Sequence, residues 1–157
     1  LASVKIGFQK RRFWNAKILC LFVPGTTGLD PLYNEIIEIG ALKVRDGKVA
    51  ERFMEFIHPQ EEISPMITNL TGITNEMVAN ARPADAVISD FLEFCEDDVL
   101  IGHNVGFDYS FMKSGASNLG LTFEKFGIDT FKNCPAHLKI TSLQKSLQSV
   151  WILPDWK

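Results

Sequence analysis

Two strand-like segments that flank a tight-turn dipeptide constrain the fold of this chain more than any other feature of the sequence. The segments cover residues 36–44 and 49–57, and Asp46-Gly47 between them is a strong hairpin signal. Residues 18–23 form a short continuous apolar run, as is typical of a buried central strand. The N-terminal half therefore predicts three strands that follow one another along the chain.

Downstream of residue 60 the pattern changes to helices that alternate with short strands. Ser64-Pro65 and Gly72 have the chemistry of a helix start and a helix stop, and Thr74 is suited to cap a second short helix. Further strands are expected at residues 99–101 and 128–131, and further helices at residues 84–96, 108–119 and 143–150. Three consecutive strands followed by this alternation predict one α/β domain in which helices pack on a mixed sheet.

Composition narrows the class of protein. The chain has 157 residues, 46% of them hydrophobic, which suits one soluble domain with an ordinary core. No apolar stretch is long enough to span a bilayer, so we expect no membrane partner. A net charge of −3 argues against a protein that coats nucleic acid by bulk charge. Three widely spaced cysteines, Cys20, Cys95 and Cys134, fit free thiols in a reducing cytoplasm.

The N-terminal segment, residues 1–16, contains lysines and arginines but no acid. We interpret it as a solvated, poorly ordered terminus that precedes a domain at residues 17–157. A basic arm that contacts phosphates is the alternative.

The sharpest chemical signal is the string HNVGFD at residues 103–108, where a buried strand ends and a helix begins. A carboxylate at such a junction can project above the sheet, where a divalent metal can be held. The alternative role for Asp108 is to cap the first turn of the helix. Other strings accompany it along the chain: TTGLDP at 26–31, IIEIGA at 36–41, LTGIT at 70–74 and GIDT at 127–130.

Together these strings resemble the DnaQ-like (DEDD) 3′–5′ exonucleases, the family of the DNA polymerase III epsilon subunit and of PolC-type exonuclease domains. The resemblance covers about residues 17–150. It implies an RNase H-like fold, hydrolysis of nucleotides from the 3′ ends of single-stranded DNA in proofreading or repair, and two Mg²⁺ or Mn²⁺ ions as cofactors. A DNA polymerase subunit is the protein partner that it suggests.

The resemblance also assigns roles to individual residues. Asp108 matches the metal ligand of the second family motif and is the only catalytic acid retained. His103, a further catalytic candidate, would shape the edge of the site. Leu70 and Ile73 match apolar positions near the terminal bases, with ordinary core packing as the alternative. The candidates for substrate binding are Thr26, Thr27, Leu70, Ile73, Asn104 and Phe107.

Two departures from the family weigh against catalysis. In relatives the first motif reads Asp-x-Glu-Thr-Thr-Gly, but here Val23 and Gly25 stand at the positions of the two acids. Neither side chain can bind a hard cation that prefers oxygen ligands. The third motif, a histidine and an aspartate on the last helix, is expected beyond Val150, where the chain reads WILPDWK. We therefore expect a C-terminally truncated domain whose flanks are either genuinely diverged or read out of frame.

These observations predict an exonuclease-type domain that is inactive or severely impaired. The alternative is a non-catalytic module that binds nucleic acid or a replisome partner. The two differ in a simple outcome: a single-stranded oligonucleotide is either degraded slowly or only bound.

Overall fold

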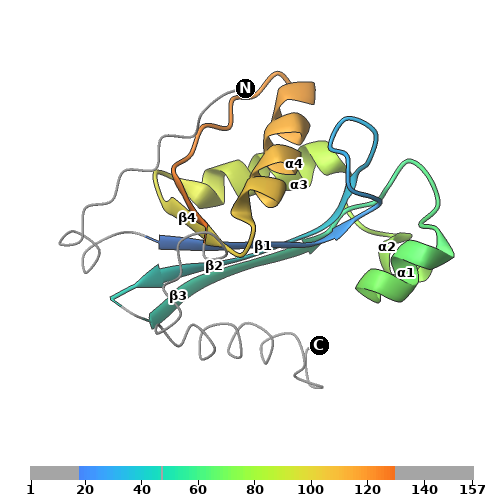
Figure 1. The fold of residues 1–157 in the computed structure, drawn as a ribbon, viewed down its shortest axis with the longest axis horizontal. Coiled ribbons are helices and arrows are strands. Elements are labelled where there is room, and N and C mark those ends of the chain that lie inside the picture. Colours follow the sequence, from blue (N-terminus) through green and yellow to red (C-terminus); the bar gives the residue numbers. More distant parts are fainter. Residues whose placement is uncertain (1–17, 47, 130–157) are drawn as a thin grey trace.

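The computed structural model describes residues 18–46 and 48–129, with the backbone alone for residues 18–24, and its centre is a five-stranded sheet (Figure 1). The sheet has the order β3-β2-β1-β4-β5, in which β1, β2 and β3 pair antiparallel, and β4 lies parallel to both β1 and β5. The predicted mixed α/β sheet is confirmed. The strands are β1 (Ile18–Thr26), β2 (Ile36–Arg45), β3 (Lys48–Phe56), β4 (Val99–Gly102) and β5 (Gly127–Asp129).

Four helices are described, in two groups. The longer two, α3 (Ala84–Cys95) and α4 (Val105–Asn118), cover one face of the sheet (Figure 1). The shorter two, α1 (Pro65–Thr71) and α2 (Asn75–Val78), form a separate lobe beyond one end of the sheet (Figure 1). Ile73, which connects α1 to α2, lies against Gly25 near the end of β1.

The caps predicted for the two short helices are confirmed. The Ser64 hydroxyl accepts from the amide of Ile67, and Pro65 is the first helical residue. Gly72 ends α1 with a φ of 78°, a left-handed conformation that glycine adopts without the cost a side chain brings. Thr74 caps α2 in the same way as Ser64 caps α1. Capping residues that are visible in the sequence therefore set the start of both short helices and the end of α1.

Two apolar clusters hold the elements together. The larger one packs the helix layer on the sheet around Phe91 and Phe111, and Phe53 of β3 meets Phe91 edge to face with ring centroids 5.3 Å apart. The smaller one fixes the lobe to β2 and consists of Ile37, Ile63, Ile67, Ile73 and Val78. Because Ile37 belongs to β2, the lobe shares a core with the sheet.

Two predicted boundaries were wrong. The strand expected at residues 18–23 continues to Thr26, because a bulge between Phe22 and Gly25 takes up the local irregularity at Pro24, whose nitrogen cannot donate to the ladder. The helix expected from Asp108 starts at Val105. The predicted segment 1–16 and the predicted helix at 143–150 lie outside the described residues.

Charged residues are buried at the end of the sheet where β1 begins. Asp98 is fully buried, and its Oδ2 lies 2.7 Å from an Arg45 nitrogen, whereas its Oδ1 has no hydrogen-bond partner among the described atoms. Lys43 is also buried; its Nζ lies 2.9 Å from Glu96 and 3.5 Å from Glu51. The contacts with Asp98 and Glu96 join β2 to the turn before β4, across β1 in the sheet, and the contact with Glu51 joins β2 to β3.

None of the described helices is long and apolar enough to cross a membrane. Of the three cysteines, Cys95 lies in the described core as a free thiol, and burial raises its pKa to about 12. The prediction of free thiols is thus met at this position.

Candidate functional site

The junction between β4 and α4 positions the one acid that the sequence singled out. Asn104 occupies the position before the helix in a left-handed conformation, with φ 60° and ψ 39°. Asn is one of the few residues with a side chain that adopts this conformation readily. The helix then starts at Val105, so Asp108 is its fourth residue and faces inward, with 9% of its surface exposed. It does not occupy the capping position that was the alternative role.

Asp129 at the end of β5 is the acid that stands with Asp108. The two strands β4 and β5 are parallel neighbours, so their carboxyl ends meet at one edge of the sheet. Asp129 is buried, and its Oδ1 accepts a hydrogen bond of 3.0 Å from the amide of Asn104. This bond connects the end of β5 to the start of α4.

The negative charge of Asp129 acts on Asp108. Burial raises the pKa of Asp108 to about 7, and the negative charge of Asp129 adds to the effect. No cation within the described part of the chain contributes to this shift. Near neutral pH, Asp108 is therefore divided between its protonated and its ionised form.

Gly25, the position of the missing glutamate, pairs with Glu38 of β2. A Cβ built on Gly25 would lie 2.6 Å from Cδ1 of Ile73, 2.9 Å from Cγ1 of Ile37 and 3.1 Å from Cβ of Glu38. Real Cβ atoms essentially never have neighbours closer than 3.0 Å. The end of β1 is thus packed tightly between β2 and the lobe.

Glu38 is a buried acid of β2 that the family resemblance did not assign to the site. Only 7% of its surface is exposed, and burial raises its pKa to about 7. No charge of Asp108 contributes to the pKa of Glu38, so the two acids do not act as one cluster. A charged residue inside the otherwise apolar string IIEIGA was the sequence signal for this position.

The two threonines after Gly25 hold the loop between β1 and β2. The Thr26 hydroxyl donates to the carbonyl of Gly28 at 2.7 Å, and the Thr27 hydroxyl accepts from the amide of Glu35 at 2.8 Å. The Thr27 amide also donates to the carbonyl of Glu35. Both hydroxyls make hydrogen bonds within the loop in this structure. Their contact with substrate stays a prediction.

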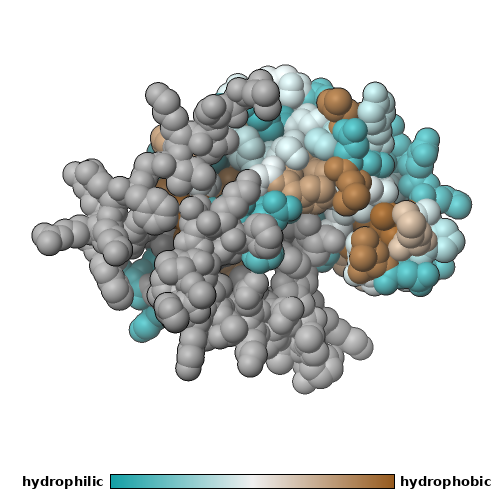
Figure 2. Space-filling view, viewed as in Figure 1, coloured by the Kyte–Doolittle hydropathy of each residue, from teal (hydrophilic) through white to brown (hydrophobic). Residues whose placement is uncertain are grey.

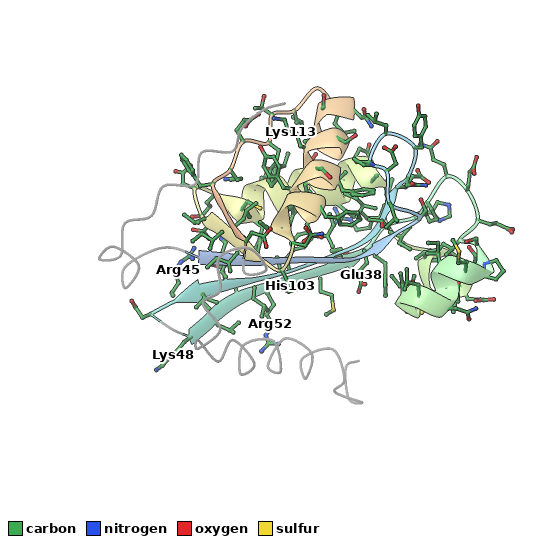
Figure 3. All side chains as sticks on the ribbon, in the orientation of Figure 1. Glu38, Arg45, Lys48, Arg52, His103 and Lys113 are labelled. Atoms are coloured by element: carbon green, nitrogen blue, oxygen red, sulfur yellow. The ribbon has the colours of Figure 1, made fainter. Side chains whose placement is uncertain are left out.

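The remaining predicted residues lie around these groups. His103 is exposed just after β4 (Figure 3), and the ring of Phe107 packs against Phe111 with centroids 4.9 Å apart. Leu70 is 75% exposed, whereas Ile73 is buried with 3% exposed. The same role near the terminal bases was predicted for Leu70 and Ile73. The turn at Gly72 instead leaves Leu70 in solvent and Ile73 in the core.

Exposed apolar side chains gather on the lobe, which Figure 2 shows at the right of the view. Met66 and Leu70 of α1 have 73% and 75% of their surface exposed. The loop between β1 and β2 adds Leu32 and Tyr33, which are 78% and 83% exposed. That loop contacts α4 through a hydrogen bond from the Ser114 hydroxyl to the carbonyl of Pro31. Exposed apolar side chains that gather on one element, as on α1, are typical of a binding surface.

The residues of the site do not fit a pair of divalent metal ions. Among residues 18–46 and 48–129, no group of three or more His, Cys, Asp or Glu side chains could hold a metal ion. Asp108 and Asp129 supply carboxylate oxygens, but β1 supplies none at Gly25. Hard cations need several oxygen ligands, so this donor set is insufficient.

A family model for exonucleases (RNase_T) matches residues 26–146. The match begins directly after Gly25, so the two positions without acids lie outside it. Among curated proteins, the chain is 48% identical over 107 residues to a PolC-type DNA polymerase III of Caldanaerobacter subterraneus subsp. tengcongensis, which covers 68% of this chain. It is 42% identical over 126 residues to the PolC-type DNA polymerase III of Thermotoga maritima, which covers 80% of this chain. The matched regions are 8% and 9% of those relatives' lengths.

Solved structures of exonuclease I are among those that match. A product-bound exonuclease I superposes with a TM-score of 0.67 at 15% identity, over 75% of this chain and 30% of that one. Escherichia coli exonuclease I in complex with a dT13 oligonucleotide gives 0.65 at 15% identity, over 73% and 28%. At this identity the likeness shows the fold, which confirms the RNase H-like architecture implied by the sequence strings. With the family model covering most of its length, the chain belongs to the DnaQ-like exonuclease family.

Proposed function

We propose that this chain is a 3′–5′ exonuclease-type domain that binds 3′ ends of single-stranded DNA and is severely impaired in their hydrolysis. The family supports the exonuclease type. The PolC-type relatives support a role in DNA replication, and the oligonucleotide complexes of exonuclease I support single-stranded DNA as the ligand. A DNA polymerase subunit in the cytoplasm is the partner that these relatives suggest.

One observation carries the impairment. In the described chain, Asp108 has a single acidic neighbour, Asp129, while Gly25 at the end of β1 is packed against apolar side chains. Metal-dependent hydrolysis needs a cation to generate the nucleophile and to stabilise the leaving oxygen. An insufficient ligand set leaves Mg²⁺ or Mn²⁺ weakly held, so the hydrolytic step loses its main source of acceleration.

The test is a degradation assay with a 5′-fluorescent single-stranded oligonucleotide in Mg²⁺ and in Mn²⁺, with exonuclease I as the positive control. We expect the oligonucleotide to remain intact at enzyme concentrations where exonuclease I digests it fully. Robust release of nucleotides that Asp108→Asn abolishes would contradict the impairment. Release that Asp108→Asn leaves unchanged would reveal a contaminating nuclease.

A binding module without catalysis is the second candidate, and the exposed apolar side chains of Met66 and Leu70 favour it. Unpaired bases have apolar faces, and packing them against such side chains removes apolar surface from water. We expect the same oligonucleotide to bind in the presence of EDTA, measured by fluorescence anisotropy. Met66→Ser and Leu70→Ser should weaken binding, whereas Leu121→Ser, an apolar side chain 40% exposed outside the lobe, is the matched control.

A further inference from the structure

We propose that Ile73 fills the place of the side chain missing at Gly25, so that apolar side chains pack this position of β1 and leave no room there for a side chain that could bind a cation. This inference rests on the proposed loss of hydrolysis and concerns its structural consequence. The Cδ1 atom of Ile73 lies 2.6 Å from where a Cβ at Gly25 would be. Real Cβ atoms essentially never have so close a neighbour, so the end of the Ile73 side chain must shift when position 25 carries a Cβ.

The backbone around Ile73 is held firmly, which keeps its side chain pointed at β1. Its amide donates to the Thr71 hydroxyl at 3.1 Å, and that hydroxyl donates to the carbonyl of Ile67 at 2.9 Å. The left-handed Gly72 between them turns the chain towards the sheet. A side chain at position 25 could therefore move only the end of Ile73, and not the segment that carries it.

A second side chain, that of Ile37, also lies within 3 Å of a Cβ built on Gly25. Cγ1 of Ile37 lies 2.9 Å from the built Cβ, and Ile37 is fully buried in the cluster that also contains Ile73. A group that replaces Gly25 thus meets a packed core on two sides. An ion placed there would lose its hydration to apolar neighbours, which is unfavourable without compensating ligands.

The decisive experiment is a double-mutant cycle between Gly25→Ala and Ile73→Val, read by thermal unfolding. Ile73→Val deletes the Cδ1 atom that is closest to the built Cβ. We expect Gly25→Ala to lower Tm by about 3 to 8 °C in the wild-type background, as overpacking does in a domain of this size. In the Ile73→Val background the loss should be smaller, because only the contacts with Ile37 and Glu38 remain. A variant Gly25→Ala that folds only together with Ile73→Val supports the proposal equally.

Equal losses in the two backgrounds would overturn the proposal, because independent sites give additive effects. Gly106→Ala is the matched control. No atom lies within 4 Å of a Cβ built on Gly106, so its Tm should be unchanged or slightly raised in both backgrounds.

A metal titration tests the second half of the proposal. Millimolar Mn²⁺ should shift the Tm of the wild-type chain by less than ~1 °C relative to EDTA at matched ionic strength, since a ligand stabilises only a fold that binds it. A saturable rise of several degrees would contradict it. The oligonucleotide assay is independent of the cycle: degradation together with coupled losses refutes the proposed function alone, and an intact oligonucleotide with additive losses refutes this inference alone.

Discussion

The two ends of the sheet treat buried acids in opposite ways. At the end where β1 begins, Asp98 is matched by Arg45, and Lys43 is matched by Glu96. At the end where β4 and β5 stop, Asp108 is buried near the like charge of Asp129, and burial raises its pKa to about 7. Pairing serves stability, whereas burial of like charges opposes it. The difference indicates that the second end keeps a buried acid, Asp108, whose charge lowers the stability of the fold.

The largest effect is expected at the paired end. Asp98→Ala leaves the part-buried Arg45 without its carboxylate, so the free energy of unfolding should fall by about 3 kcal/mol. Chemical denaturation at neutral pH measures it. A loss below about 1 kcal/mol would mean that solvent already screens this pair and would remove the contrast between the two ends.

At the other end, Asp108→Asn should stabilise the fold at pH 8 by about 2 kcal/mol, because the amide carries no charge that burial and Asp129 oppose. The pKa is raised from 3.8 to about 7 on folding. Below pH 3.8, Asp108 is protonated in both the folded and the unfolded chain, so it does not lower the free energy of unfolding. As the pH rises towards 7, the unfolded chain loses this proton first, and the free energy of unfolding falls. The gain of Asp108→Asn should be small at pH 4 and constant above pH 8, in urea unfolding at each pH.

Glu38→Gln should behave in the same direction, with a gain of about 1 to 2 kcal/mol at pH 8. Its pKa is raised from 4.5 to about 7, with burial as the cause, so the gain should develop between these two values. A gain that is independent of pH would show that shape, rather than charge, distinguishes the two side chains.

The smallest effect is expected for Asp90→Ala, which removes the exposed pair with Arg82, where the atoms are 2.7 Å apart. Both partners are about half exposed, so the change in unfolding free energy should lie within experimental error. A clear loss would show that ion pairs matter in this fold irrespective of burial.

Much of the fold was predictable because local chemistry determines it. Ser64, Gly72 and Thr74 marked the limits of the lobe helices, and the Asp46-Gly47 turn and the continuous apolar run at residues 18–23 marked the first strands. The start of α4 was not predictable, because the left-handed Asn104 that precedes it has no side-chain capping bond. Local signals specify elements well when a cap or a turn residue is part of the signal.

The candidate site was predictable only in part. The sequence identified Asp108 through its string, and the absence of acids at Val23 and Gly25 was visible directly. The electrostatic link from Asp108 to Asp129, and the contact of Ile73 with Gly25, depend on which strands become neighbours. The same is true of Asp98 and Arg45, whose 53-residue separation gives no local signal.

The position of β1 between β2 and β4 has a consequence for how the molecule forms. The hairpin of β2 and β3 pairs residues that are close in the chain, whereas β1 and β4 pair residues that are far apart in it, such as Ile18 and Val99. Contacts between distant segments are slow to form because a long loop must first be closed. The region that contains Asp108 of α4 and Asp129 of β5 is therefore expected to form late. During synthesis it can form only after the ribosome has made the residues up to Asp129.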